Sequence, residues 1–511
     1  MQLQIGIILI IMVAAYAVAK ANKLSVEISM LASAVAGGIA GAFLGTPPLS
    51  QLPRHLVEGS FTYLDVILVF STATIFMAIV NESGGVNYVV RATIKYFYNI
   101  RILALLLLMI IILIPGALTG AGSVSLLVVG APTALALGYL GIPKPKVAAI
   151  IFIVAGLSAA APPVNIWAMI TCAGTAIPYV GFELPLGIPV LVLGIFTVLT
   201  LGWRRESKMD RETVLQEMPE VPAKMSWWRV LVPFLIFFGL VIAYRIWPFD
   251  IPILGLPLEF TAAALAAWLL SPKRINILKL SGDTMKRLLP LLATMVVVGM
   301  LQQIMTATGV RGMLSFAVIS TPLILLFISL AIVIPVSEGI LTYGAAAVIG
   351  IPLVWFLDSI GLHATVVISG LSLLWPLGDG LPPTALIGRL SVMVSDYKGS
   401  YWSFLKKTWL PWIVITLVGI LMIVFSAHLD FLVDWSIIIL NNPLAMLWPL
   451  IQLLILILLF ISIVQLFKLI FSTRTRKVTR IMLLAVTLIL LILEFLWIVR
   501  IIMGIIVLWN T

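Results

Sequence analysis

The sequence predicts an all-α polytopic membrane protein made of two related halves. Three observations predict this class. Of the 511 residues, 62% are hydrophobic and only 10% are charged, too few polar side chains to cover a soluble protein of this length. Uncharged runs of about 20 residues, the length that spans a hydrocarbon layer, recur along the chain. Proline and glycine positions also repeat at a constant offset, which indicates an internal duplication.

The apolar runs are continuous rather than alternating, so helices are expected to satisfy the backbone hydrogen bonds within the membrane. The first run extends to Ala19 without a preceding basic region or a small-residue cleavage site, and we expect it to be a retained first helix. Representative uncharged runs are Ile102–Leu118, Phe316–Val336, Trp409–Ala427 and Leu447–Phe467.

The formal net charge of +11 comes from lysine and arginine residues in short loops between the apolar runs. They gather at positions 204–229, 273–287 and 468–480. An excess of basic residues in short loops marks the cytoplasmic face of a membrane protein. We therefore expect a multi-pass protein of the inner (cytoplasmic) membrane, with anionic lipids as partners of these loops and no nucleic-acid partner.

One long hydrophilic stretch, residues 203–228, is predicted to be a polar cytoplasmic linker between the two halves. The first half then covers residues 1–202 and the second covers residues 229–427. Residues 428–511 form a C-terminal extension with two further apolar runs, Leu447–Phe467 and Ile481–Leu508. These four segments are the expected organisation of the chain.

The duplication is seen in residues that recur 220 positions apart without any gap. Each half is expected to contain a helix that ends at the first proline, a hairpin rich in small residues (about 116–140 and 336–352) and a helix broken by two prolines (about 147–177 and 363–394). The recurring residues are Pro115 and Pro335, Gly130 and Gly350, Pro132 and Pro352, Gly141 and Gly361, and the pairs Pro162-Pro163 and Pro382-Pro383.

A double proline in an apolar helix removes two backbone donors and leaves carbonyl groups without their helical partners. Within a membrane, such backbone is tolerated only where protein buries it or a wet cavity receives it. Freed carbonyls can bind Na⁺, and the N-termini of half-helices attract an anion. Interrupted helices at corresponding places in two halves therefore predict a transporter site; the alternative is a pair of proline kinks that serve packing only.

Four motifs resemble those of a known family when they are taken in order. They are the Asn-Glu-Ser-Gly-Gly turn ending Val80–Gly85, the small-residue segment Gly116–Ser123, and the breaks Ala161–Pro163 and Leu381–Pro383. From about Leu24 to Ala427, the chain resembles the large membrane subunit of the tripartite ATP-independent periplasmic (TRAP) transporters, within the ion-transporter superfamily.

This resemblance implies an elevator-type transporter with two structural repeats, two re-entrant hairpins and two broken helices. It further implies Na⁺ as the coupling ion and a small organic anion as substrate, usually a dicarboxylate or sialic acid. The implied partners are a small membrane subunit and a periplasmic substrate-binding protein. The chain departs from the family in having Asp379 at the second break and in its C-terminal extension, which is either a replacement or docking site for the small subunit or a peripheral appendage.

Candidate site residues lie at the hairpins and breaks, where hydroxyl, amide and carboxylate oxygens adjoin the freed backbone. Alternative roles are helix packing for the small residues, a solvated loop for the acids, and an interfacial position for Arg389. The predicted substrate ligands are Thr119, Ser123, Ser125, Asn165, Thr384 and Arg389. The predicted Na⁺ ligands are Gly120, Ala161, Pro162, Glu338, Thr342, Gly378 and Asp379.

An enzyme is not expected, because no catalytic motif is present. None of His55, His363 and His428 has a histidine or cysteine neighbour at helical spacing, and the sequence has no Walker loop. No cofactor is expected apart from Na⁺. The main alternative is a stand-alone cation/proton antiporter or anion symporter of the same superfamily that needs no binding protein.

Counting apolar runs gives about six crossings in each half, which predicts parallel repeats, whereas the family resemblance implies inverted ones. One run in each half can instead be an arm on the membrane surface. The candidates for this arm are residues near Gly85–Ile102 and Ser271–Leu288.

Overall fold

The computed structural model describes the chain apart from residues 1, 46, 204–210, 248–249, 251 and 442–511. The chain forms two units. The first comprises Met1–Val241 and Ile253–Ile437, and the second comprises Ile242–Pro252 and Ile438–Thr511. The runs predicted at Leu447–Phe467 and Ile481–Leu508, and the basic residues at 204–208 and 468–480, lie outside the described residues. The description below concerns the first unit.

Every regular element in the described part of the chain is helical, and nine of its helices are long and apolar enough to cross a membrane. The all-α polytopic class is therefore confirmed. The first half contains α1 (Gln2–Ala21), α2 (Val26–Leu44), α3 (Leu52–Ser60), α4 (Leu64–Glu82), α5 (Gly85–Phe97), α6 (Arg101–Thr119), α7 (Gly122–Ser125), the π-helix η2 (Leu126–Gly130), α8 (Ala131–Tyr139), α9 (Lys144–Ala160), α10 (Ile166–Thr175), α11 (Glu183–Gly202) and α12 (Arg211–Glu217).

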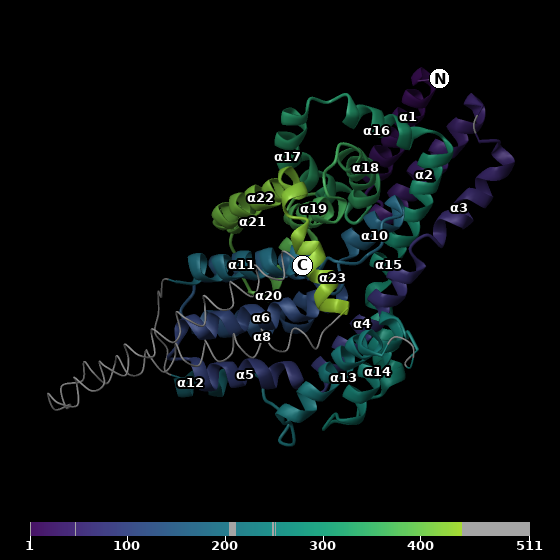
Figure 1. The fold of residues 1–511 in the computed structure, drawn as a ribbon. Coiled ribbons are helices and arrows are strands. Elements are labelled where there is room, and N and C mark those ends of the chain that lie inside the picture. The colour runs from purple at the N-terminus through teal and green to yellow at the C-terminus, as the bar shows by residue number, and fades with distance from the viewer. Residues whose placement is uncertain (1, 46, 204–210, 248–249, 251, 442–511) are drawn as a thin grey trace. The chain divides into compact units, whose positions relative to one another are not determined.

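The second half repeats the hairpin and the broken helix in the same order along the chain, and Figure 1 labels its helices. It contains α13 (Trp227–Ile246), α14 (Leu256–Leu269), α15 (Ile277–Ala307), α16 (Val310–Ile319), α17 (Leu323–Leu341), the π-helix η3 (Ala346–Gly350), α18 (Ile351–Ser359), α19 (Ala364–Gly378), α20 (Leu386–Val394), α21 (Tyr401–Leu405), α22 (Trp409–Val424) and α23 (Phe431–Asn441).

The offset of 220 residues holds for whole elements. It separates the starts of η2 and η3, of α8 and α18, of α9 and α19, and of α10 and α20. Both Pro-Pro bonds, Pro162-Pro163 and Pro382-Pro383, are cis. A π-helix in the returning arm of each hairpin is a feature that the sequence pattern did not predict. The structure thus repeats the hairpin and the broken helix in both halves.

Contrary to the prediction, the helix that leads into each hairpin continues past its proline. Pro115 lies inside α6 and Pro335 lies inside α17. A proline costs a helix one hydrogen bond, but ending the helix within an apolar layer would leave several backbone groups without partners. The helix α6 instead ends at Gly120, which adopts φ 70°, a conformation that glycine adopts without steric cost.

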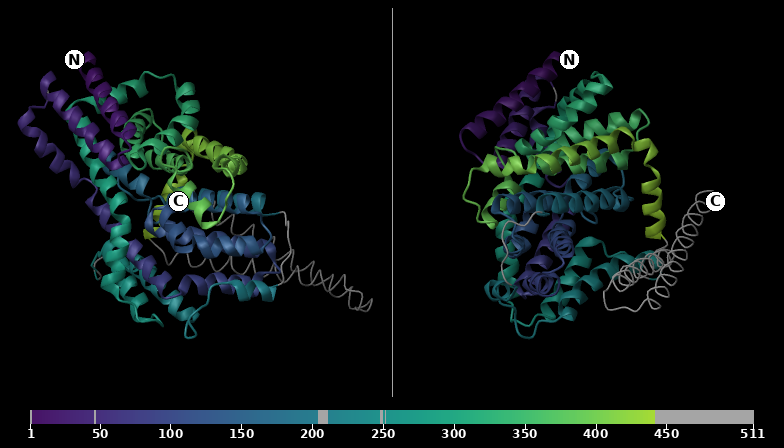
Figure 2. Two further views of the ribbon diagram at one scale, coloured as in Figure 1. Left: turned by 180° about the vertical axis from the view of Figure 1, so that it is seen from behind. Right: turned by 90° about the vertical axis from the view of Figure 1, so that its left-hand side faces the viewer.

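Two groups of helices make up the first unit. The scaffold helices are α1–α4 and α13–α15, and the core helices are α6–α11 and α17–α22 with η2 and η3. The helices α1, α2, α3 and α15 of the scaffold lie side by side (Figure 2). The helix α13 joins the scaffold through ring contacts, Phe234 with Phe76 of α4 and Phe237 with Phe260 of α14.

A close helix crossing holds the scaffold halves together. A side chain at Gly59 of α3 would come within 2.7 Å of the Gly299 carbonyl oxygen on α15, and one at Gly299 would come within 2.2 Å of the Gly59 oxygen. One turn further along, the Tyr63 hydroxyl donates a hydrogen bond to the Gln302 side chain. Small residues allow such backbone contact between membrane helices.

The helices α5 and α16 connect scaffold to core and have only 13 and 10 residues. Neither is among the helices long enough to span a membrane. The segment Ser271–Leu288, the other proposed arm, lies largely within the 31-residue α15, so the arm of the second half is α16. Whether the repeats are inverted or parallel stays a prediction.

Candidate functional site

Each hairpin contacts the broken helix of its own half through an equivalent backbone hydrogen bond. The Val164 amide donates to the Ala117 carbonyl (3.1 Å), and the Thr384 amide donates to the Gly339 carbonyl (3.3 Å). The Thr384 hydroxyl donates to the same Gly339 oxygen (2.9 Å). Each break is therefore bridged to its hairpin.

The hairpins also pack against the broken helix of the opposite half. The helix α10 contacts η3 and α18, whereas α20 contacts α7 and η2. Close approaches mark these contacts: a side chain at Gly174 would meet Ile351, and one at Gly130 would meet Val394. Both breaks and both hairpins consequently form one packed core.

Two predicted Na⁺ ligands, Glu338 and Asp379, come together in this core. Glu338 lies near the end of α17 and is 1% exposed, and Asp379 directly follows α19 and is 5% exposed. The two carboxylates interact electrostatically. A side chain at Gly378 would come within 2.6 Å of the Glu338 Cβ atom and 2.1 Å of the Pro335 oxygen. Because residue 378 is glycine, the break can press directly against the hairpin.

The acid pair has no basic partner among the residues that the structure describes, where the ion pairs involve other residues. The Glu338 Oε2 atom is buried without a hydrogen bond. A buried carboxylate without a partner is costly within a membrane. A hard cation prefers oxygen ligands, and two carboxylates beside the backbone carbonyls of a helix break supply them. These residues therefore fit Na⁺. A bound proton would also neutralise their charge.

Aromatic side chains surround the acid pair. The ring centroid of Trp167 lies 5.2 Å from that of Tyr343 and 6.5 Å from that of Trp375. Tyr343 interacts electrostatically with both acids, and Trp167 interacts with Glu338. The indole nitrogens of Trp167 and Trp375 are buried without hydrogen bonds in normal geometry. These rings exclude water from the acids and supply donors that have no other partner.

The pair of tryptophans and Tyr343 were not predicted as site residues. Trp167 lies four residues after Pro163, and Tyr343 directly follows Thr342 at the tip of the second hairpin. An aromatic residue next to a helix break was the available signal, whereas the contact between α10 and the opposite hairpin depends on the tertiary fold.

The predicted substrate ligands of the first half use their donors within the protein. The Thr119 hydroxyl donates to the Pro115 carbonyl (2.7 Å) and the Ser125 hydroxyl donates to the Ile112 carbonyl. The Asn165 side chain accepts from the Ala168 amide and donates to Ala160. What remains on the hydroxyls are acceptor lone pairs, which suit a cation better than a carboxylate.

The remaining candidates occupy different positions. Ser123 is buried in α7, next to the turn at Gly120. Thr342 takes φ 52° at the end of α17, and its hydroxyl donates to Leu341. Ala161 and Pro162 form the first break itself. Arg389 is exposed and donates to the Pro383 carbonyl (3.0 Å), so its guanidinium stays at the outer side of the second break.

The acid site has no charged counterpart in the first half. The positions 220 residues before Glu338 and Asp379 hold Leu118 and Ala159. The duplicated backbone therefore carries a charged site at only one of its two equivalent places.

These features define a duplicated helical membrane protein with hairpins and broken helices meeting in a core, an architecture of secondary transporters. Solved structures with this fold include the YdaH transporter of Alcanivorax borkumensis, described as having an unusual topology, at 12% identity and a TM-score of 0.50 over 73% of this chain and 87% of that one. Another is MtrF of Neisseria gonorrhoeae, described within a class of antimetabolite efflux pumps, at 13% identity and a TM-score of 0.50 over 74% and 84%.

At these identities the likeness concerns the fold. Compared with protein-family models and with curated proteins, the sequence gives no match. Membership of the TRAP family therefore stays a prediction.

Proposed function

We propose that this protein is a secondary active transporter that moves a small organic anion across the inner membrane, coupled to Na⁺ held by Glu338 and Asp379. The observation that carries the proposal is the buried acid pair at the second break, without a basic partner among the described residues. Such a pair needs a bound cation or a proton to remain in the membrane. Bound Na⁺ supplies the positive charge; the chain orients the two acids and excludes water from them.

Movement of the core helices against the scaffold helices would carry the substrate, as in an elevator. The short arms α5 and α16 support this proposal, since they are the connections between scaffold and core. A small membrane subunit and a periplasmic binding protein remain proposed partners. Their requirement can be tested by comparing uptake into proteoliposomes with and without a candidate binding protein.

The coupling site is tested by equilibrium binding of ²²Na⁺ to the purified full chain, which requires no knowledge of the substrate. We expect Glu338→Gln and Asp379→Asn each to weaken Na⁺ binding by about tenfold or more. Asp358→Asn, which changes an exposed acid at the end of α18, is the matched control and should bind like the unaltered chain. Unchanged ²²Na⁺ binding in both site variants would sink the assignment.

A proton-coupled antiporter is the second candidate, and the unpartnered Glu338 oxygen favours it as well. The two functions differ in their driving force. If the protein is a cation/proton antiporter, a pH gradient alone should drive Na⁺ across the proteoliposome membrane in exchange for protons, which a pH-sensitive dye reports. Glu338→Gln should abolish that exchange. If Na⁺ binds and a pH gradient has no effect, the first candidate stands.

A further inference from the structure

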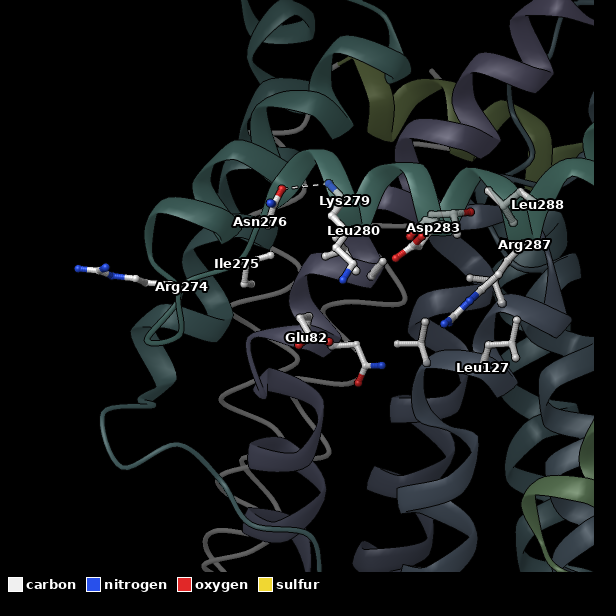
Figure 3. Close-up of a pocket in the computed structure, with 16 residues that line it drawn as sticks. Glu82, Leu127, Arg274, Ile275, Asn276, Lys279, Leu280, Asp283, Arg287 and Leu288 are labelled. Carbon is white, nitrogen blue, oxygen red and sulfur yellow. Dashed lines mark hydrogen bonds between the residues drawn. The ribbon is translucent and has the colours of Figure 1, made fainter.

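A second polar site lies away from the acid pair, between the scaffold and the tip of the first hairpin. It is a pocket of about 400 Å³ lined by the end of α4, the start of α15 and residues of α7 and η2. Figure 3 shows Lys279, Asp283 and Arg287 projecting from α15 toward Glu82 and Leu127, whereas Arg274 points away. The pocket is therefore charged on its scaffold side and apolar on its hairpin side.

The charges on α15 follow the helical repeat. Lys279, Asp283 and Arg287 are spaced by four residues and share one face of the helix. Among the described residues, neither basic side chain forms an ion pair. Glu82 lines the pocket from α4. Lys279 and Arg287 can pair with an anionic group, and Glu82 and Asp283 can accept from a hydrogen-bond donor on the same ligand.

The second hairpin also borders a pocket against the scaffold, of about 430 Å³, lined by Met12 and Leu301 of the scaffold and by Val336 and Ile349 of the hairpin. Among the residues that the structure describes, no charged side chain lines that second pocket. The two pockets between scaffold and hairpin therefore differ in polarity, and of the two only the one beside the first hairpin offers charged partners to a ligand.

The pocket opens on the face that the basic loops predict to be cytoplasmic. The linker between the halves contacts the turn after α4, where a side chain at Gly84 would come within 2.6 Å of Pro222. Glu82 lies two residues before that turn. A ligand in the pocket would therefore enter from, or leave to, the cytoplasm.

We propose that this pocket binds a small soluble carboxylate that also carries an amino or amide donor. Lys279 and Arg287 hold the carboxylate, and Glu82 accepts from the donor. This inference rests on the proposed function, because it assumes that the ligand of the pocket belongs to the class of molecule that the protein transports. Binding in the pocket does not itself require Na⁺ or a gradient.

The probe pair is L-aspartate and succinate, which differ only by the amino group on the same carbon chain. The reporter is Leu127→Cys in a Cys172→Ser chain, since Leu127 lines the pocket and is 51% exposed. Leu135→Cys, on the same hairpin and outside the pocket, is the control reporter. The measurement is the rate of labelling by a membrane-impermeant maleimide on the purified full chain.

We expect aspartate to slow labelling at position 127 by about fivefold or more at saturation, to do so better than succinate, and to leave position 135 unchanged. Lys279→Ala and Arg287→Ala should each raise the aspartate concentration for half-protection by about tenfold, whereas Lys286→Ala, on the same helix and outside the pocket, should not. Glu82→Gln should reduce protection by aspartate to that by succinate.

Three results would overturn the proposal. The first is a labelling rate at position 127 that neither aspartate nor succinate changes. The second is protection that survives the loss of both Lys279 and Arg287. The third is slower labelling when phosphatidylglycerol replaces phosphatidylcholine as the surrounding lipid, with no effect of aspartate. The last would assign the pocket to a lipid phosphate. Loss of ²²Na⁺ coupling with intact aspartate protection would refute the coupling site and leave this pocket standing.

Discussion

Gly378 decides how closely the second break approaches the second hairpin. A side chain at this position would come within 2.1 Å of the Pro335 oxygen and 2.6 Å of the Glu338 Cβ atom. Neither of these atoms is the end of a flexible side chain, so the helices themselves would have to separate. The position of Glu338 beside Asp379 consequently depends on a residue that has no functional group.

We predict that Gly378→Ala lowers the free energy of unfolding by about 1–3 kcal/mol, the cost of overpacking a closely packed contact. It should also weaken ²²Na⁺ binding, because it displaces Glu338. Gly282→Ala is the control, since Gly282 lies in α15 with open space around its Cα, and alanine favours a helix. Thermal unfolding in detergent measures the stability of the two variants, Gly378→Ala and Gly282→Ala. Equal stability of the two would contradict the prediction.

The ion pair between Lys144 and Asp396 joins the start of α9 to the loop after α20, at the surface of the core. The Lys144 Nζ atom lies 2.7 Å from the Asp396 carboxylate and 3.1 Å from its backbone oxygen. The hydrogen bond from Lys144 lowers the pKa of Asp396 from its ordinary value of 3.8. A lowered pKa means that the pair stabilises the folded state above that ordinary value and loses its effect as the pH falls through the folded pKa.

We predict that a double-mutant cycle with Lys144→Ala and Asp396→Ala gives a small favourable coupling that is constant between about pH 5 and pH 8. The coupling should vanish as the pH falls below 3.8 and should shrink in about 1 M salt, since the pair is exposed. The unfolding midpoints of the four variants measure it. Coupling that grows on acidification would be the opposite of the expected sign.

At the scale of single elements, the first broken helix is held together by one side chain. Asn165 caps α10 by accepting from the Ala168 amide (3.0 Å) and donates to Ala160 at the end of α9 (3.1 Å). It is completely buried. The two half-helices are therefore joined across the prolines by hydrogen bonds rather than by continuous helix.

We predict that Asn165→Ala destabilises the protein by about 1–2 kcal/mol, the upper part of the range for lost helix caps, because water cannot replace the amide. Asn276→Ala removes the equivalent cap of α15 at an exposed position and should cost less, about 0.5 kcal/mol. Thermal unfolding compares them. A larger loss for the exposed cap would argue against this role of Asn165.

The elements show which parts of the fold the sequence could reveal. The breaks at Pro162-Pro163 and Pro382-Pro383 were predictable, because a double proline interrupts any helix. The continuation of α6 through Pro115 was not, since it depends on the apolar layer around the helix. Glu338 was predicted as a ligand from its rarity in apolar sequence, whereas the approach of Trp167 depends on packing between opposite halves.

At the scale of the whole first unit, the two repeats have similar backbone folds. They differ in the side chains that lie between each hairpin and the scaffold. The first hairpin borders a charged pocket of about 400 Å³, whereas the second borders an apolar pocket of about 430 Å³ and contacts the scaffold closely at its tip. A side chain at Gly344 in its tip would lie 3.3 Å from the Val298 Cγ2 atom of α15 and 3.1 Å from the Met30 Sδ atom. The second hairpin therefore touches the scaffold at its tip and borders an apolar pocket along its length.

If the core moves against the scaffold during transport, the contact between Gly344 and Val298 must break. We predict that cysteines at both positions, in a Cys172→Ser chain, form a disulfide, because a side chain at position 344 would lie 3.3 Å from the Val298 Cγ2 atom, close to where a cysteine sulfur at 298 can lie. The disulfide should abolish transport, and a reductant should restore it.

The control is the pair Gly37→Cys and Met12→Cys, which joins α2 to α1 within the scaffold, where a side chain at 37 would come within 2.5 Å of Met12. This control disulfide should leave transport intact. Full activity of the oxidised 344–298 pair would show that this part of the core stays on the scaffold, and would exclude the elevator movement proposed for it.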